Sequence, residues 1–433
     1  MPRKTHAGRP VYVVDGSRTP FLRAHGGPGL FRASDLAVAA GRPLLLRQPF
    51  PAEALDQVIL GCVAAGPDEA NFARLVALRL GCGERMPAWT VQRNCASGLQ
   101  ALDSATQEIA WGRSELVLAG GSEAMSHHPV LLNEEMVAWL AAWKRARGAA
   151  SRGRLLSSLR PHHFRPVIAL LHGLSDPLAG LSMGQTAEQL AWRFDVTREA
   201  MDRFALESHR RLAEAQEQGR LDEIEPLFDT NGGLHDRDDG LRRESSLEKL
   251  AALKPAFDRP IGKVTAGNSA QITDGAALLL LASERAVEQY NLNVIGRILD
   301  CQWTALEPSE MGLGPVHALG RLLQKQSLDS EEIDYWEINE AFAAQVLACL
   351  AAWRDADYMA REVGFEPLPT PIPEERLNVD GGAIAIGHPV GASGARLVLH
   401  LLKTLHHRRA RRGVAGLCIG GGQGGALLLE RVP

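Results

Sequence analysis

Short apolar runs and longer amphipathic runs alternate along this chain. Apolar runs that end at turn-forming residues predict buried strands over residues 11–16, 115–121, 277–283, 294–300 and 414–422. Apolar residues at helical spacing predict helices over residues 199–219, 316–326 and 341–356. Strands that alternate with helices are typical of layered proteins, so we expect an α/β fold.

A faint internal repeat divides the chain. ASGLQAL at 96–102 resembles ASGARLV at 392–398, and each is followed by a helix and then by a strand that ends in glycines. We infer two halves of the same topology, residues 1–285 and 286–433. Residues 126–262 break the alternation because they are helix-rich and irregular, and they predict a loop domain inserted into the first half.

Composition and charge argue against several classes of protein. The 433 residues carry a formal net charge of −4, whereas a nucleic-acid-binding chain has a clear basic excess. Six scattered cysteines include no Cys-x-x-Cys pair, which indicates reduced thiols rather than a disulfide framework. We find neither an uncharged apolar run of about 18 residues nor a secretory signal ahead of the first strand, so we expect a cytoplasmic protein without a membrane span.

One stretch of the insertion has an unusual charge pattern. Between Met136 and Ser175 there are seven Lys or Arg residues and no Asp or Glu, and Trp139 and Trp143 lie near them. Basic segments that carry tryptophan can rest at the periphery of an anionic membrane or contact a partner protein, and they can also bind a nucleotide phosphate. A solvated basic face is the simplest alternative, and the sequence leaves all four open.

Cys95 lies just before a predicted helix. Leu99, Leu102 and Ile109 fall on one face of this helix, and Gly112 can end it. Most free cysteines are buried and inert, which is the simplest role for this one. A thiol at a helix N-terminus, however, experiences the positive end of the helix dipole, which favours the thiolate form of a nucleophile.

Three further stretches contain candidate catalytic groups. His388 lies in a loop of glycines and proline ahead of a predicted helix, which suits a general base better than most positions. Cys418 ends an apolar strand, and the backbone N–H groups of the glycines from Gly420 onward can face an oxyanion. Asn339 follows a strand-like run; it is either the N-cap of a helix that starts there or an amide that holds a water or a carbonyl.

Two other kinds of site find no support in the sequence. The adjacent histidine pairs lack the spacing of metal ligands on a helix, so we expect no metal site. The glycine run 420–422 is followed by another strand-like run and not by the helix that a dinucleotide phosphate needs. This order argues against a nicotinamide oxidoreductase.

Together these stretches resemble the motifs of the thiolase family. RNCASGLQA (93–101) resembles its nucleophile motif, NEAFA (339–343) its asparagine motif, GGAIAIGHPVGASGAR (381–396) its histidine motif and CIGGGQGGA (418–426) its second-cysteine motif. DGSRTPF (15–21) and TAGNSAQITDGAA (265–277) resemble its first strand and turn and its CoA-facing segment. The six motifs follow the family's order over essentially the whole chain.

The resemblance implies a duplicated five-layer αβαβα fold and acyl transfer through Cys95. In the implied reaction His388 takes the proton of Cys95, the thiolate attacks the 3-keto carbon of a 3-ketoacyl-CoA, and Cys418 protonates the departing enolate. Asn339 would hold a water that donates to the enolate oxygen, and the backbone N–H groups of Cys95 and Gly420 would hold the oxyanion. Coenzyme A enters as a co-substrate, and the resemblance implies no bound cofactor.

Within the family the chain resembles the β-subunit type of the fatty-acid β-oxidation complexes. The resemblance lies in LSMGQTAEQLA (181–191), RRESSLEKLAALKPAF (242–257) and the long insertion. It implies 3-ketoacyl-CoA thiolysis, with Met183, Asn268 and Ser269 as contacts of the substrate and CoA. Two positions depart from the family. Ala270 stands where the family has the serine that contacts the pantetheine of CoA. Asp380 stands where asparagine is common, a change that the sequence does not explain.

Several alternatives remain open at this level. An acetoacetyl-CoA thiolase usually has His-Met where this chain has Ser182 and Met183, and a non-catalytic thiolase-like lipid-binding protein would share only the fold. A ketoacyl synthase would carry a second histidine where this chain has Asn339. The family also implies a homodimer or homotetramer, and a hydratase/dehydrogenase α-subunit is the expected partner.

Overall fold

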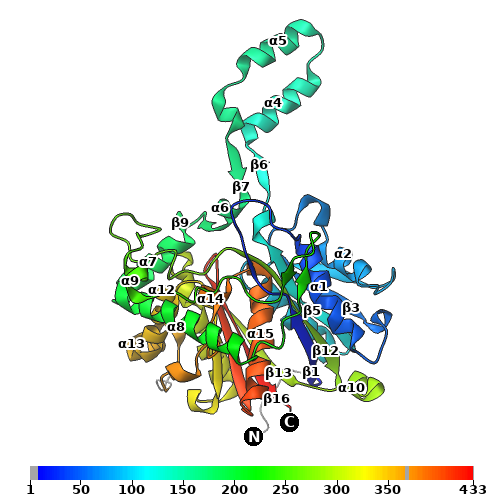
Figure 1. Cartoon of the computed structure of the whole chain (residues 1–433), viewed down its shortest axis with the longest axis vertical. Coiled ribbons are helices and arrows are strands. Elements are labelled where there is room, and N and C mark those ends of the chain that lie inside the picture. The colour runs from blue at the N-terminus through cyan, green and yellow to red at the C-terminus, as the bar shows by residue number, and fades with distance from the viewer. Residues whose placement is uncertain (1–7, 366–369, 433) are drawn as a thin grey trace.

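A computed structural model describes residues 8–365 and 370–432 of the chain. Ten strands form one continuous mixed sheet in the order β14-β15-β16-β13-β1-β12-β5-β3-β4, with β2 paired to β12 (Figure 1). Their bounds are β1 (Val11–Arg18), β2 (Leu22–Arg23), β3 (Gln57–Gly61), β4 (Ala88–Val91), β5 (Leu116–Ala124), β12 (Thr273–Ser283), β13 (Gly296–Ala305), β14 (Tyr335–Ile338), β15 (Arg412–Ile419) and β16 (Gln423–Arg431).

The sheet consists of two halves in which four strands follow the same order, and the first half also carries β4 at its edge and the short β2. In the first half β3 is parallel to β4 and β5, whereas β5–β12 and β12–β1 are antiparallel pairs. In the second half β14–β15 is a parallel pair, whereas β15–β16 and β16–β13 are antiparallel. The halves join where residues 11–13 of β1 pair with residues 296–298 of β13. The repeat suggested by the two ASG motifs is therefore a repeat of topology.

The two helices that carry the ASG motifs lie in the middle of the molecule. These helices, α3 (Ser97–Ala110) and α15 (Val390–His407), pack against each other, and α15 contacts strands of both halves of the sheet. Further helices cover the outer faces of the two halves and complete the five-layer αβαβα arrangement that the sequence predicts. They are α1 (Ala33–Leu46) and α2 (Phe72–Arg79) on the first half, and α11 (Gly314–Gln326) and α12 (Ala343–Arg354) on the second.

Three large apolar clusters hold these layers together. One surrounds α3 and α15 and includes the fully buried Leu99, Leu102, Leu397 and Leu401. The other two fill the spaces between the outer helices and the two halves of the sheet. Burying one leucine stabilises a fold by about 1.5–3 kcal/mol, so packing fixes α3 and α15 firmly. Their N-termini, where Cys95 and His388 lie, are thereby held on one rigid framework.

The strands and helices named from the sequence pattern are present, with one error in a boundary. The apolar runs form β1, β5, β12, β13 and β15, and the helical patterns form α8 (Arg198–Glu217), α11 and α12. The expectation that a helix starts at Asn339 is wrong, because α12 begins at Ala343 and Phe342 is its N-cap. The N–H of Asn339 instead donates to the carbonyl of Gly416 at 3.0 Å, which continues the pairing of β14 with β15 past its end.

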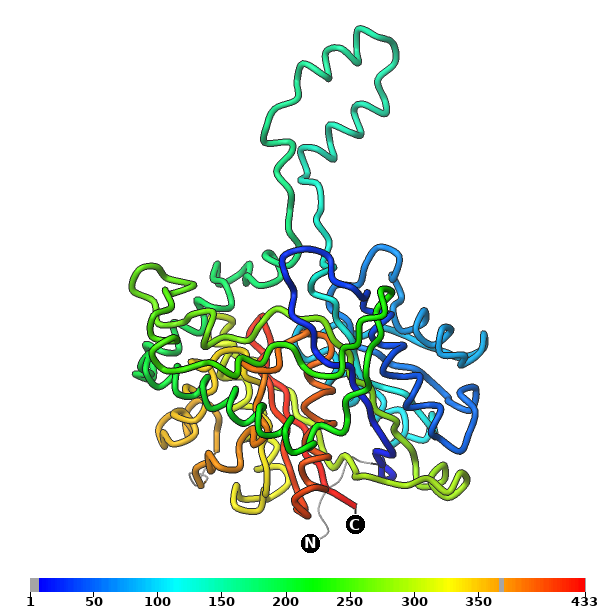
Figure 2. The backbone as a smooth tube through the Cα atoms, in the orientation of Figure 1, coloured from blue at the N-terminus to red at the C-terminus, as the bar shows by residue number. Residues whose placement is uncertain are grey.

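Between β5 and β12 the chain leaves the sheet and first forms a narrow projection. A two-stranded ribbon, β6 (Val130–Leu132) and β7 (Pro166–Ile168), carries the helical hairpin of α4 (Glu134–Arg145) and α5 (Ala149–Ser158). Residues 130–168, which we call the finger, extend well beyond the rest of the molecule (Figures 1 and 2). The helix-rich insertion predicted from the sequence thus contains one element that stands apart from the layers.

The chain then returns along the surface of the body to β12. The elements on this path are α6 (Ala169–Gly173), β8 (Ser175–Asp176), β9 (Leu181–Ser182), α7 (Met183–Arg193), α8, β10 (Leu227–Phe228), β11 (Leu234–His235) and α9 (Leu247–Ala251). The remaining short helices are α10 (Glu284–Tyr290), α13 (Ala356–Tyr358) and α14 (Ala383–Ile386). Within the described part of the chain, no helix has the length and apolar character that a membrane crossing requires.

Candidate active site

Cys95 lies in a tight loop between β4 and the first turn of α3. Its neighbour Asn94 has a φ of 43°, a left-handed conformation that asparagine tolerates better than most residues. The hydroxyl of Ser97 accepts the N–H of Arg93 at 2.8 Å and donates to the carbonyl of Asn94 at 2.7 Å. These bonds fix the loop, so the thiol is held two residues ahead of Ser97, where α3 begins, as the sequence predicts.

The surroundings of the Cys95 thiol act on its pKa in opposite directions. Burial raises this pKa above its ordinary value, and the Glu123 carboxylate adds to the increase. The backbone N–H groups of Gly420 and of Cys95 itself oppose this, because both donate toward the sulfur. The thiol is therefore protonated at rest, and two N–H donors face the position where negative charge would develop during an attack.

Gly420 occupies the turn of the β15–β16 hairpin. Gly421 and Gly422 follow it with φ angles of 89° and 75°, a conformation that favours glycine. The side-chain amide of Asn94 donates to the Gly420 carbonyl at 2.8 Å and ties this turn to the Cys95 loop. Because the glycines turn directly into β16, they do not form the strand–loop–helix unit of a dinucleotide site.

Cys418 lies near the end of β15, almost fully buried. It belongs to a small cluster with Met311, Ala341 and the adjoining Met183. Burial raises the pKa of its thiol well above the ordinary value, and the nearby Cys95 raises it further. A thiol of this kind remains protonated at neutral pH and can deliver a proton to a strong base next to it.

His388 is held in one tautomer. The hydroxyl of Ser393 donates to the carbonyl of Pro389 at 3.0 Å, so it accepts from the Nδ1–H of His388, which lies 2.6 Å away. This leaves Nε2 unprotonated, so its lone pair accepts a long hydrogen bond of 3.4 Å from the side-chain amide of Asn339. Burial, with a further contribution from the charge of Arg396, lowers the pKa of His388 to about 4. His388 is therefore a neutral imidazole at neutral pH, which is the form that accepts a proton.

Asn339 lies beside His388, at the end of β14. Its Nδ2 is 3.4 Å from Nε2 of His388, and its side chain is fully buried. Its Oδ1 is buried and has no hydrogen-bond partner among the described residues. A buried amide oxygen costs free energy unless it is hydrogen bonded, so this position suits a water or a substrate group.

The loops that carry these residues are fastened to one another at close range. A Cβ placed on Gly98 would lie 2.8 Å from the Gly391 carbonyl oxygen, so only glycine lets the first turns of α3 and α15 approach this closely. The buried carboxylate of Glu123, on β5, accepts the N–H groups of Val63, Ala64 and Gly391 at 2.8–3.1 Å. Glu123 therefore holds the first turn of α15, just after His388, against the first half of the molecule.

The three predicted substrate and CoA contacts have different surroundings. Met183 lies at the catalytic cluster, and its Sδ is 3.4 Å from the point where a Cβ on Gly420 would lie. Asn268 is fully buried; its Nδ2 donates to Asp202 at 2.9 Å and its Oδ1 accepts the N–H of Thr265. Its side chain thus braces residues 265–268 from inside. The Ser269 hydroxyl likewise donates to the Thr265 carbonyl at 2.7 Å.

Asp380, which the sequence left unexplained, belongs to a buried charge network. It pairs with Nε of Arg220 at 2.8 Å and with Nε2 of His400 at 3.4 Å, and Nδ1 of His400 is 3.0 Å from Glu223. Burial lowers the pKa of His400, but the two carboxylates outweigh this and raise it to about 10. His400 is therefore an imidazolium, and the carboxylate of Asp380 is its counter-charge, a role that asparagine would not fill.

This network predicts strong coupling between Asp380 and His400. Asp380→Asn leaves a buried imidazolium with one carboxylate fewer, so we expect it to lower the free energy of unfolding by about 3 kcal/mol. Asp380→Asn combined with His400→Gln removes both charges. The double variant should therefore lose less free energy of unfolding than the two single variants lose in sum, by about 1 kcal/mol or more. Urea unfolding of the four proteins measures this coupling. Strictly additive changes would contradict the assigned ion pair.

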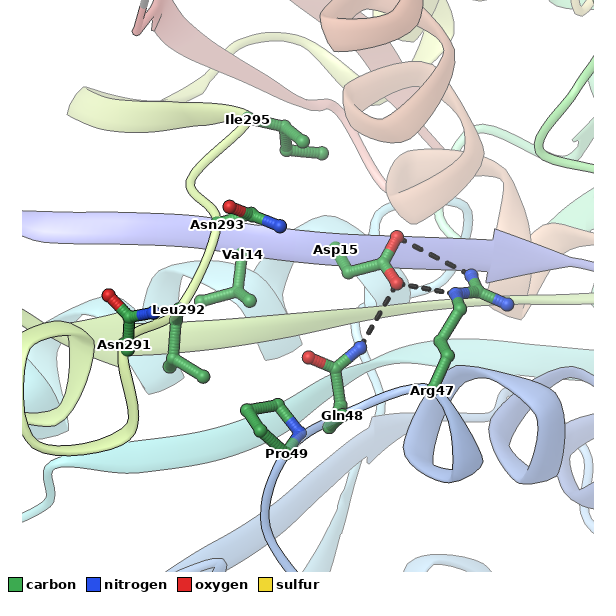
Figure 3. A pocket seen from close by; sticks show the side chains of 9 residues that line it. All are labelled: Val14, Asp15, Arg47, Gln48, Pro49, Asn291, Leu292, Asn293 and Ile295. Atoms are coloured by element: carbon green, nitrogen blue, oxygen red, sulfur yellow. Dashed lines mark hydrogen bonds and ion pairs between the residues drawn. The ribbon is translucent and has the colours of Figure 1, made fainter.

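Away from these residues the surface has other hollows, one of which Figure 3 shows. It has a volume of about 530 Å³ and lies beside β1, and the guanidinium of Arg47 and the amide of Gln48 both hydrogen bond to Asp15 in it (Figure 3). None of its lining residues is a candidate catalytic residue.

Over residues 8–365 and 370–432, no three His, Cys, Asp or Glu side chains gather as a metal ion would require.

Comparison with known proteins agrees with the motifs and the fold. The family model described as thiolase, N-terminal domain, matches residues 11–285, and that described as thiolase, C-terminal domain, matches residues 292–431. The β-ketoadipyl-CoA thiolase of Pseudomonas aeruginosa is 40% identical, over 98% of this chain and 100% of its own. The mitochondrial trifunctional enzyme subunit beta of Homo sapiens is 35% identical, over 98% of this chain and 89% of its own.

Solved structures show the same relationship. The crystal structure of human mitochondrial 3-ketoacyl-CoA thiolase superposes with a TM-score of 0.84 at 34% identity, over 98% of this chain and 99% of that one. The crystal structure of the Bacillus anthracis acetyl-CoA acetyltransferase gives a TM-score of 0.81 at 33% identity, over 98% of this chain and all of that one. The chain belongs to the thiolase family of acyltransferases.

Proposed function

We propose that this enzyme is a 3-ketoacyl-CoA thiolase, which cleaves a 3-ketoacyl-CoA with CoA to acetyl-CoA and a shortened acyl-CoA. The observation that supports this is the combination of a half-buried thiol, a buried thiol and a neutral imidazole. Cys95 faces two N–H donors, Cys418 stays protonated beside it, and His388 presents an unprotonated Nε2. These are the groups that a thiol nucleophile, a proton donor and a general base require.

The first half of the proposed reaction transfers the acyl group to the enzyme. His388 accepts the proton of Cys95 as the sulfur attacks the 3-keto carbon, and the N–H groups of Cys95 and Gly420 hold the resulting oxyanion. The bond between C2 and C3 then breaks, which leaves an acyl-thioester on Cys95 and the enolate of acetyl-CoA. His388 and a water held by Asn339 donate to the enolate oxygen, and Cys418 gives its proton to C2. One lost oxyanion donor costs about 3–4 kcal/mol of transition-state stabilisation.

The second half regenerates the enzyme. The thiolate left on Cys418 takes the proton of an incoming CoA thiol, and the CoA sulfur attacks the acyl-thioester. Collapse of the second tetrahedral intermediate breaks the bond between the acyl carbon and the Cys95 sulfur and releases the shortened acyl-CoA. The departing Cys95 thiolate takes back the proton that His388 has held, so both residues return to their starting states. CoA is in this proposal a co-substrate, and the chemistry uses no bound cofactor.

The substrate separates this proposal from its main alternative, an acetoacetyl-CoA thiolase. We expect kcat/KM for a C16 3-ketoacyl-CoA to exceed that for the C4 compound by about tenfold or more, because each added buried methylene strengthens binding. The assay should include 3-oxoadipyl-CoA, since several relatives are β-ketoadipyl-CoA thiolases. Activity confined to C4 would favour the alternative. No CoA-dependent turnover of any of the three would favour a lipid-binding protein.

The setting of the enzyme follows from the same proposal. We place it in fatty-acid β-oxidation, as a cytoplasmic homodimer or homotetramer with a hydratase/dehydrogenase α-subunit as partner. The trifunctional enzyme beta subunits among its relatives support a partner of this kind. Peripheral contact of residues 136–175 with a membrane also belongs to this setting. Analytical ultracentrifugation of the chain alone and with a candidate α-subunit tests the assembly.

A further inference from the structure

Glu340, the residue that follows Asn339, is a buried carboxylate without a cation of its own. It is 1% exposed, and it forms no ion pair with the other described residues. Arg396, whose charge lowers the pKa of Glu340, forms its ion pair with Glu337 instead, at 3.0 Å. Because burying an unpaired charge is unfavourable unless hydrogen bonds compensate it, the donors around this carboxylate indicate its role.

Hydrogen bonds connect this carboxylate to the segment of chain that leads to His388. Its Oε1 accepts from the side-chain amide of Asn378 at 2.9 Å, and its Oε2 accepts from the N–H of Ile384 at 3.3 Å. The hydroxyl of Ser208, on α8, also donates to Oε2 at 2.6 Å and accepts the N–H of Gly382 at 3.1 Å. The segment is therefore fastened to the carboxylate both directly and through one hydroxyl.

The segment passes the carboxylate at a distance that only glycine allows. A Cβ on Gly382 would lie 2.2 Å from the carboxyl carbon of Glu340, and a Cβ on Gly381 would lie 2.7 Å from the backbone carbonyl oxygen of Ser208. Gly381 also has a φ of 84°, which favours glycine. A change in this carboxylate therefore acts directly on the backbone ahead of His388.

The same bonds fix the end of β14, which carries Asn339. The side chain of Asn378 accepts the N–H of Ile338 and donates to its carbonyl, both at 2.9 Å, and so extends the edge of the strand. Asn339 thus lies between two neighbours that are both tied to this segment. Its Nδ2 is 3.4 Å from Nε2 of His388, and this separation depends on the bonds that Glu340 forms.

We propose that Glu340 is a positioning residue, which sets the distance between Asn339 and His388 for the enolate oxygen. This inference rests on the proposed function, in which both groups serve carbon–carbon cleavage. His388 has two further ties: its N–H donates to the Gln271 carbonyl at 3.2 Å, and its Nδ1 lies 2.6 Å from the Ser393 hydroxyl. Loss of the bonds of Glu340 should therefore displace Asn339 from His388 while the imidazole remains able to act as the base for acyl transfer.

Glu340→Gln tests this with two reactions of the same enzyme. Glutamine keeps the volume, but either orientation of its amide sets an N–H group against the donor of Asn378 or that of Ile384. Thiolysis of the 3-ketoacyl-CoA that wild type cleaves fastest needs the enolate. Exchange of labelled CoA into an acyl-CoA passes through the Cys95 acyl-thioester and forms no enolate. We expect thiolysis to fall about 100-fold in kcat with little change in KM, and exchange to stay within about threefold.

Two further variants separate positioning from stability. Ser208→Ala removes a donor from the carboxylate and an acceptor from the N–H of Gly382, so it should lower the ratio of thiolysis to exchange by about tenfold. If Glu340→Gln does not fold, Ser208→Ala takes its place in every measurement. Glu430→Gln makes the same substitution at a buried carboxylate, at the other end of β16 from Gly420, and should leave the ratio unchanged.

Equal losses of thiolysis and exchange in Glu340→Gln, or wild-type rates for both, would overturn the proposal. Crystal structures of wild type and variant give a second measurement that needs no turnover. The distance from Asn339 Nδ2 to His388 Nε2 should differ between them by about 0.5 Å or more, and an unchanged distance would also overturn the proposal. A wild-type enzyme that exchanges CoA but cleaves no 3-ketoacyl-CoA would contradict the proposed function instead, and the two structures would still decide the role of Glu340.

Discussion

Replacing Cys95 with serine should reduce thiolysis by on the order of 10⁴-fold or more, the scale of nucleophile loss in a covalent catalyst. The hydroxyl is a much poorer nucleophile than the sulfur that faces the N–H groups of Cys95 and Gly420. Steady-state rates with a 3-ketoacyl-CoA and CoA measure this loss. Incubation with an acyl-CoA alone should leave no acyl mass on this variant.

Cys418→Ser should also lose thiolysis, by about 10²–10⁴-fold, because proton delivery to C2 is removed. It should nevertheless still take up an acyl group on Cys95, since Cys418 is not the nucleophile. Cys82→Ala, a buried cysteine outside the site, is the matched control and should keep wild-type rates. An acyl group found on any residue other than Cys95 would contradict the division of roles between the two thiols.

Replacing His388 with asparagine should lower kcat/KM by about 10²–10⁴-fold, the usual contribution of a general base. The wild-type pH profile gives a second, independent test. His388 accepts a proton only when neutral, and its pKa is about 4, so activity should persist as the pH falls below 6 and disappear as the pH passes through about 4. An ordinary histidine would instead give an acid limb near 6.5.

Circular dichroism is recorded at each pH of the activity profile, so that acid unfolding is not mistaken for protonation of His388. Alkylation of Cys95 by iodoacetamide adds a further check. Because the pKa of Cys95 is raised and that of His388 is lowered, the resting pair is a thiol and an imidazole, and alkylation should be slow at neutral pH and accelerate as the pH rises. Fast alkylation at neutral pH would indicate a resting thiolate–imidazolium pair.

The fold and the main catalytic candidates could be predicted from the sequence because their signals are local. Cys95 and His388 each precede a helix that opens with the same small-residue motif, and the duplicated topology places those two helices side by side. Gly420 follows a strand-like run and leads into another, which is enough to indicate a hairpin turn. The order of motifs then predicts the family and its five layers.

The residues that hold the site were missed because their partners are far away in the sequence. Asn94 reaches the carbonyl of Gly420, and Glu123 reaches the N–H of Gly391. Asn94 did carry one signal, since asparagine is the residue that most readily adopts a positive φ in a tight loop. Nothing local distinguishes Glu123 from any other acidic residue at a strand end.

The boundary error at Asn339 and the unexplained Asp380 have the same origin. Asn339 is a good N-cap by type, but its N–H is taken by the neighbouring strand, which delays the helix to Ala343. The role of Asp380 depends on its contact with His400, a residue on α15 that lies outside the recognised motifs. The sequence pattern also could not predict that the finger projects from the body, because projection depends on the contacts that a segment lacks.

One measurement tests the central claim, acyl transfer through Cys95, most directly. The wild-type protein is mixed with a 3-ketoacyl-CoA in the absence of free CoA, digested, and its peptides are weighed by mass spectrometry. A shortened acyl group on the Cys95 peptide, with release of acetyl-CoA and loss of the label when CoA is added, is the result we predict. Release of acetyl-CoA with no acyl group on Cys95, or a label that CoA does not remove, would contradict it.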